Sequence, residues 1–205
     1  MIHPKIRLML VAAAMGLSST PGLAQQASGF DRMKFVDAVR KEDGGTLREL
    51  LDKHGKPILN AVDGKGDTPL TVSIRKRHDW VYFFLAEGAD PNLPGPDGDT
   101  PLIVAARAGF TGAAEQLLKR KAAVDAENKR GETALIVAVQ ARQVPIVKLL
   151  LEHGANPDES DNFQGRSARD YAKQNTRDRE LLTLIESVKR KSTSKPPVSA
   201  DDFKL

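Results

Sequence analysis

The stretch GDTPLIVAARAGF at residues 98–110 decides the fold, because its first five residues recur elsewhere in the chain. GDTPL also begins at Gly66, and weaker copies, GETAL and GRSAR, begin at Gly131 and Gly165. The threonine or serine of the successive copies stands at positions 68, 100, 133 and 167, so the steps are 32, 33 and 34 residues. A period this constant predicts a repeat architecture, in which one helical or strand unit is used several times.

Each copy carries the signals that begin a helix. Its threonine or serine can cap the first turn by accepting a backbone N–H, and Pro69 and Pro101 follow at the first helical position, where a missing N–H costs nothing. A glycine precedes each cap by two residues, where a turn can require a positive φ. In the copy at residue 98 we expect a short helix over residues 101–108. A second helix should follow Gly109, with Leu117 on its apolar stripe.

The second helices end in a way that supports the same unit. In two copies the helix stops at a Gly-Ala pair, beginning at Gly88 and Gly154, as a left-handed glycine cap would. The segments Asp90-Pro91-Asn92 and Asn156-Pro157-Asp158 then turn the chain into a loop. The unit is therefore a turn, a short helix, a second helix and a loop, and the predicted fold class is all-α.

This pattern resembles the ankyrin repeat family, whose repeat runs G-x-T-P-L-H-x-A-A-x-x-G-H-x-x-V-V-x-x-L-L-x-x-G-A-D-x-N. The matching groups are Thr100-Pro101-Leu102, Ala105-Ala106 and Gly109 in one copy, and Ile146-Val147, Leu150-Leu151 and Gly154-Ala155-Asn156 in the next. The resemblance covers Gly29 to Val188. It implies an ankyrin repeat solenoid of about five helix-turn-helix units with connecting β-turn loops. Its end units lack full motifs, because each of them has one face exposed to solvent.

The chain departs from the family pattern at three places. The family's histidine is replaced by Thr71, Ile103 and Ile136, so the usual side-chain bracing between neighbouring loops is expected to be missing. Lys121 stands where a helix-ending glycine is expected, which predicts a less regular corner. The second helix after Asp63 is aromatic, and we interpret it as a core refilled with larger groups rather than an exposed binding site. The residues predicted to be buried there are Trp80, Val81, Phe84 and Leu85.

Residues 1–24 have the organisation of a secretory signal peptide. Lys5 and Arg7 form a basic start, residues 8–17 (LMLVAAAMGL) are apolar or small, and Gly22-Leu23-Ala24 has the spacing of a cleavage site, so cleavage is expected between Ala24 and Gln25. Ten apolar residues reach roughly 15 Å as a helix, against ~30 Å for a bilayer core, so no stable membrane insertion is expected. Export to the periplasm is the resulting prediction, with extracellular release as the alternative.

The two ends of the chain account for its basic character. Residues 25–28 are interpreted as a short linker, and residues 189–205 (KRKSTSKPPVSADDFKL) as a disordered tail, because they are poor in large apolar groups. The sequence pI is about 9.3. Removing the two basic residues of the leader, and the five basic and two acidic residues of the tail, from totals of 31 and 27 leaves 24 basic and 25 acidic residues. This near-neutral body lacks the basic footprint of a nucleic-acid-binding protein.

No catalytic constellation is visible in the sequence. The chain has no cysteine, its four histidines lack metal-ligand spacing, and no serine stands in a nucleophile motif. We therefore expect no cofactor, no metal and no enzymatic activity. The alternatives are a secreted effector that acts on another cell, and an enzyme with a cryptic site.

The resemblance instead implies that another protein binds to the concave face, which loop tips and first helices build in such solenoids. The expected exposed positions are Lys65, Asp67, Arg75, Lys76, Asp97, Asp99, Arg107, Lys129, Arg130, Glu132, Gln140, Phe163, Gln164 and Arg166. Phe163 is the candidate anchor, because a large apolar group on a polar loop is typical of a binding hot spot. The alternative is that it tucks under the last repeat. The protein is expected to be a monomer.

Cleavage after Ala24 can be tested directly. Removal of 24 of the 205 residues leaves a mature chain of 181 residues that begins at Gln25. Intact-mass measurement of the protein recovered from the exported fraction should give that mass. A mass that still includes Met1 would contradict both the cleavage and the predicted location.

Overall fold

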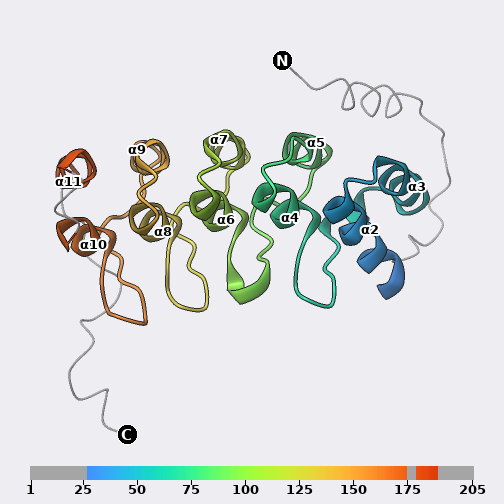
Figure 1. The fold of residues 1–205 in the computed structure, drawn as a ribbon, viewed down its shortest axis with the longest axis horizontal. Helices are drawn as coiled ribbons and strands as arrows, with labels where there is room; N and C mark the ends of the chain where they lie inside the picture. Colours follow the sequence, from blue (N-terminus) through green and yellow to red (C-terminus); the bar gives the residue numbers. More distant parts are fainter. Residues whose placement is uncertain (1–26, 175–178, 189–205) are drawn as a thin grey trace, which may run out of the picture. The chain divides into compact units, whose positions relative to one another are not determined.

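The computed structural model describes residues 27–174 and 179–188, and these residues form helices joined by turns and loops (Figure 1). In chain order the helices are α2 (Gly29–Lys41), α3 (Gly44–His54), η2 (Lys56–Asn60), α4 (Pro69–Arg75), α5 (Trp80–Glu87), η3 (Pro96–Gly98), α6 (Pro101–Ala108), α7 (Thr111–Lys119), α8 (Ala134–Gln140), α9 (Val144–Glu152), α10 (Ala168–Gln174) and α11 (Arg179–Glu186). The described residues contain no strand, only an isolated bridge between Ser160 and Ser167. The predicted all-α repeat fold is confirmed. The predicted leader, cleavage site and tail lie outside the described residues.

The chain divides into two compact units, the first ending at Pro96 and the second beginning at Asp97. In the first unit α2 packs against α3 and α4, and α4 packs against α5. In the second unit the first helices of successive repeats pack side by side, α6 on α8 and α8 on α10. The second helices α7, α9 and α11 each pack on the first helix of their own repeat. The repeat read from the sequence is therefore also the packing unit.

The core of the first unit is aromatic, as predicted. Trp80, Val81, Phe84 and Leu85 are all buried, and so is Phe83. The Phe84 ring lies 6.2 Å from that of Phe35 in α2 and 5.7 Å from that of Phe83, centroid to centroid. Such tilted and edge-on ring pairs add to the stabilisation that comes from burying apolar area. Trp80, Phe83 and Phe84 of α5 therefore fill the core, whereas Tyr82 is exposed.

The second unit has a core of small and branched residues. Ala105 and Ala106 of α6 are fully buried, where their size lets the neighbouring helix approach. Leu117 of α7 and Leu150 of α9 are also fully buried. Because the chain has no cysteine, packing of this kind takes the place of cross-links.

Three threonines cap the first helices as expected. The hydroxyls of Thr68, Thr100 and Thr133 each accept the backbone N–H three residues further on, at 3.0 to 3.3 Å. Thr71, which replaces the family's histidine, completes a capping box, because its hydroxyl oxygen accepts the backbone N–H of Thr68. These caps satisfy amides that the first turn would otherwise leave without a partner.

The corner at Lys121 is regular, so the prediction of a less regular corner was wrong. Lys121 has a φ of 63°, in the left-handed region that Gly154 occupies in the next repeat. The residue after each of them donates its N–H to a carbonyl five residues earlier, at 3.0 Å in both repeats. A non-glycine residue is costly in this conformation. The surrounding helix packing nevertheless holds it there.

The last repeat is held by an arginine that the sequence analysis did not single out. Arg169 is buried and pairs with Asp158, with 2.7 Å between Nε and Oδ1. Its guanidinium also donates to the backbone carbonyls of Ile185 and Val188, each at 3.0 Å. These bonds satisfy carbonyls at the end of α11, so Arg169 ties the final helix to the loop before α10.

Leu150→Ala should lower the free energy of unfolding by about 2–5 kcal/mol, because it leaves a cavity in a fully buried position. Lys148→Ala, on the exposed side of the same helix, should stay within about ±0.5 kcal/mol. Urea unfolding followed by circular dichroism measures both variants. Equal effects would contradict the assignment of the buried face of α9.

Candidate functional site

The loops that precede α4 and α8 are each organised by one side-chain oxygen. Asp63 Oδ1 accepts the backbone N–H of Lys65 at 2.8 Å and that of Asp67 at 2.9 Å. In the second unit Asn128 Oδ1 accepts the backbone N–H of Arg130 at 2.9 Å and that of Glu132 at 3.0 Å. An Asp or Asn at the start of a turn can make such bonds to the amides that follow it. These acceptors therefore fix the loop backbone.

The loop before α10 uses the same device and displays an exposed phenylalanine. Asp161 Oδ1 accepts three backbone N–H groups, those of Phe163, Gln164 and Gly165, at 3.0, 2.6 and 3.1 Å. Its other oxygen accepts the hydroxyl proton of Tyr171 at 2.5 Å. The side chain of Phe163 is 75% exposed, so the alternative that it tucks under the last repeat is wrong.

Neighbouring loops of the second unit are also joined through the backbone. The N–H of Lys129 donates to the carbonyl of Asp97 at 3.0 Å, and the N–H of Asn162 donates to the carbonyl of Arg130 at 2.7 Å. Gly131 lies so close to the next loop that a Cβ there would stand 2.7 Å from Asn162. Thr71, Ile103 and Ile136 stand where the family has its bracing histidine, and in the second unit these backbone hydrogen bonds join the loops instead.

An arginine of the first unit gathers three carboxylates around its guanidinium. Arg40 pairs with Asp37 and Asp67, each at 2.6 Å, and with Asp63. Arg75 also pairs with Asp67, at 3.0 Å. Burial alone would raise the pKa of Asp63, but hydrogen bonds from Arg40 and the loop amides lower that pKa below its ordinary value. Asp67 is buried, so its predicted exposure was wrong.

A similar cluster stands in the second unit. Arg107 pairs with Asp99 at 3.1 Å and with Glu132 at 3.8 Å, while Arg130 pairs with Glu132 at 2.7 Å. The amide nitrogen of Asn128 donates to both carboxylates, at 2.8 and 2.9 Å. Glu132 is buried, so it too was wrongly predicted to be exposed. Its carboxylate braces the loops instead.

Most of the other predicted contact residues do reach solvent. The exposed ones are Lys65, Arg75, Lys76, Asp97, Arg107, Lys129, Arg130, Gln140, Phe163 and Gln164, and Asp99 and Arg166 are half-buried. Within the second unit, hydrogen bonds link the loop of Asp97 to that of Lys129, and the loop of Arg130 to that of Phe163. Arg166 donates to the amide oxygens of Gln164 and Gln174, at 2.8 and 3.0 Å.

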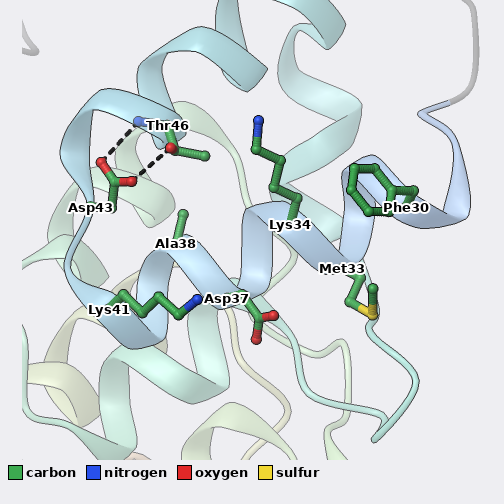
Figure 2. A pocket seen from close by; sticks show the side chains of 8 residues that line it. All are labelled: Phe30, Met33, Lys34, Asp37, Ala38, Lys41, Asp43 and Thr46. Atoms are coloured by element: carbon green, nitrogen blue, oxygen red, sulfur yellow. Dashed lines mark hydrogen bonds between the residues drawn. The ribbon is translucent and has the colours of Figure 1, made fainter.

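A hollow of about 290 Å³ lies beside α2 in the first unit (Figure 2). Its two carboxylates are already engaged, because Asp37 pairs with Arg40 and Asp43 caps the first turn of α3. The pKa of Asp43 is lowered, mainly by a hydrogen bond from the Thr46 hydroxyl and next by one from the Thr46 backbone amide. A general acid needs a raised pKa instead. The hollow therefore offers no acid–base pair.

The part of the chain that the structure describes contains no group of three or more histidine, aspartate or glutamate side chains placed to hold a metal ion. Over the same residues, none of the helices has both the length and the apolar character needed to cross a bilayer. What the described surface does offer is a set of fixed loops that present charged groups and one aromatic side chain.

Tyr171→Phe removes the hydroxyl group that bonds to Asp161, and the pH dependence of stability then tests whether this bond supports the Phe163 loop. Burial, and next the hydrogen bond to Asp161, raise the pKa of Tyr171 to about 12, from an ordinary value of 10.0. Because the folded protein holds this proton more tightly than the unfolded chain does, the stabilisation is complete below pH 10 and is lost as the pH rises to about 12. The stability difference between wild type and variant should therefore narrow over that range. Urea unfolding at pH 9, 10, 11 and 12 measures it, and a constant difference would contradict the contact.

Comparison with known proteins places these loops in a family. The model for ankyrin repeats (3 copies) matches residues 79–161. The chain is 33% identical to human neurogenic locus notch homolog protein 2 over 142 residues, 68% of this chain and 6% of that protein. It is 31% identical to a putative ankyrin repeat-containing protein of Treponema pallidum over 144 residues, 70% of this chain and 44% of that protein. It thus spans less than half the length of either. Residues 79–161 are ankyrin repeats, and the described chain has the ankyrin repeat fold.

Proposed function

We propose that this chain is a non-enzymatic protein-binding module, and that its second unit binds a partner protein through the loops before α8 and α10. Ankyrin repeats generally mediate interactions between proteins. The observation that carries the proposal is Phe163, 75% exposed on a loop whose backbone Asp161 holds. Removing an aromatic side chain of this size from water gives a large part of the binding energy at many interfaces.

The hydrogen bonds of this loop favour binding, because they reduce the entropy that association must overcome. A mobile loop loses conformational freedom when a partner fixes it, whereas a loop already held in place loses little. Asp161 holds the backbone of the Phe163 loop, and the bond from Asn162 to Arg130 links it to the preceding loop. The aromatic ring is thus presented from a fixed position.

The charges around the ring favour a partner with carboxylates near an apolar recess. Lys129 and Arg130 are exposed on the loop before α8, and Arg166 follows Phe163 on the next. At the tips of these two loops, residues 128–132 and 161–166, the acidic side chains are Glu132 and Asp161, and both are buried and bonded within the protein. Asp125 and Glu127, earlier in the loop before α8, are exposed. The exposed charge at the two loop tips is therefore positive, and it should speed the approach of an acidic partner.

The comparisons support a module rather than an enzyme. Segments similar to this chain occur in proteins as different in name as a neurogenic locus notch homolog protein and a transient receptor potential cation channel. A unit reused in such different proteins is expected to supply binding, because chemistry depends on a specific site. An enzyme with a cryptic site would need an acid–base pair in a closed pocket.

The leader-like residues 1–24 support export of the protein, and we propose the periplasm as its place of action. A secreted effector that acts on a target in another cell is the alternative. Fractionation separates the two, because a periplasmic protein is released by osmotic shock and an effector is found in the medium.

Phe163→Ala should raise the dissociation rate of the partner complex roughly tenfold or more, because the complex loses an aromatic anchor that the partner would bury. The partner is first identified by affinity pull-down and mass spectrometry, and surface plasmon resonance then measures the kinetics. Val62→Ala, which truncates an exposed apolar side chain of the first unit, is the control and should leave the rate unchanged. Equal rates for wild type and Phe163→Ala would contradict the proposed site.

Lys129→Glu should slow association with an acidic partner, and added salt should slow association of the wild type in the same way. Lys129 suits this test better than Arg130, because Arg130 neutralises the buried Glu132 and its reversal would disturb the cluster. Lys148→Glu makes the same charge change on the exposed side of α9 and is the control. An effect of Lys148→Glu alone would place the interface on the second helices.

A further inference from the structure

The outward face of α2 in the first unit is unusual for a terminal repeat. Terminal repeats of stacked proteins carry a polar outer face, because no neighbour covers them. Here Phe30 is 68% exposed and Met33 is 44% exposed. Both line the hollow beside α2, together with Lys34, Asp37 and Lys41 (Figure 2).

These residues form one stripe along the helix. Positions 30, 34, 37 and 41 are separated by three or four residues, so their side chains project from the same side of α2. The opposite side is already used, because Phe35, Val36 and Val39 are buried within the first unit. The stripe is therefore free of the packing that holds α2 in place.

The stripe is complementary in charge to itself. It carries two lysines, Lys34 and Lys41, and one aspartate, Asp37. Asp37 Oδ1 accepts a hydrogen bond from Arg40 at 2.6 Å, but 44% of the Asp37 side chain stays exposed. Lys34 makes a long contact to Glu49, at 3.9 Å, between partly exposed groups. A lysine and an exposed aspartate three residues apart suit a two-fold symmetric contact, in which the same pair forms twice.

An antiparallel pairing of two α2 helices gives this contact a definite register. In an antiparallel pair of identical helices, the position numbers of two residues that face each other always add up to the same total. If the two-fold axis passes between positions 35 and 36, Lys34 meets Asp37 of the partner subunit, and the reverse contact forms across the axis. The same register sets Phe30 beside Lys41 of the partner subunit, where the lysine stem covers the ring and its ammonium group can approach the ring face.

We propose that the chain self-associates through the outer stripe of α2, with a second copy of the same chain as the occupant. The proposal departs from the sequence-based expectation of a monomer. A contact made mainly by one helix from each copy is smaller than a standard interface, so the dimer is weak and forms at high protein concentration.

Sedimentation equilibrium of the full chain tests the proposal over a range of concentrations. The weight-average mass should rise from 22.3 kDa towards twice that value as the concentration approaches about 1 mM, the range of weak association. Phe30→Ser should weaken association at least tenfold. Lys65→Glu, an exposed lysine of the same unit outside α2, is the control and should leave association unchanged.

A charge exchange tests the register itself. In the Lys34→Glu variant the new carboxylate faces Asp37 of the partner subunit, and in the Asp37→Lys variant the new lysine faces Lys34 of the partner subunit. Like charges then meet at both contacts, so each variant should remain monomeric. A mixture of the two variants should associate, because both contacts then join opposite charges. Circular dichroism melts show whether each variant is folded, and Lys34→Asp combined with Asp37→Lys in one chain should also restore the dimer.

Three results would overturn the proposal. One is a wild-type mass that stays at 22.3 kDa at every concentration, which leaves the stripe to another occupant, such as a different protein or residues 8–17 of this chain. The second is self-association that Phe30→Ser and Lys34→Glu leave unchanged, which places the contact elsewhere. The third is a mixture of folded Lys34→Glu and Asp37→Lys variants that does not associate.

Discussion

Three loops of the described chain, those before α4, α8 and α10, each depend on one side-chain oxygen at the start of the turn. Asp63, Asn128 and Asp161 each accept two or three of the backbone N–H groups that follow, which a tight turn would otherwise leave without partners. Such amides are costly to bury and mobile when left to water. Once they are satisfied, the next residues are positioned: the threonine caps that begin α4 and α8, and the exposed tips between turn and helix. The loop before α6 departs from this rule, because Gly95 precedes the short helix η3 and Asp97 takes a φ of 60°.

The charged residues near these loops form ion pairs within the protein, and only part of their charge is left for binding. In each unit an arginine from a first helix reaches the acidic residue that precedes a threonine cap, as Arg40 does with Asp67 and Arg107 does with Glu132. The acids are buried, while Arg107 and Arg130 are about half exposed. In each pair the carboxylate is buried and part of the guanidinium reaches solvent, so the surface around these loop tips is more basic than their sequence alone indicates. This asymmetry is the electrostatic reason to expect an acidic partner.

The sequence predicted much of the fold, because the repeat sets helix starts, helix ends and the buried stripe at fixed spacing. Thr68, Thr100 and Thr133 cap as expected, and Trp80 and Phe84 of α5 are buried as expected. It predicted the exposure of Phe163 only as one of two alternatives, because exposure depends on where the loop is tied. Asp67 and Glu132 were misjudged for a related reason: they are polar residues in turns, and only the packing of neighbouring repeats shows that arginines enclose them. Arg169 was missed because its carbonyl partners lie 16 and 19 residues further along the chain.

Because these hydrogen bonds form within the chain, the loops before α8 and α10 are fixed in the free protein and are not ordered by a partner. Hydrogen exchange of single amides, measured by NMR on the unbound protein, tests it most directly. We expect the N–H groups of Asn162, Gln164 and Gly165, which donate to Arg130 and Asp161, to exchange far more slowly than in an unstructured peptide. Exchange of all three at the rate of an unstructured peptide would contradict the claim, because the loop that carries Phe163 would then be mobile before binding.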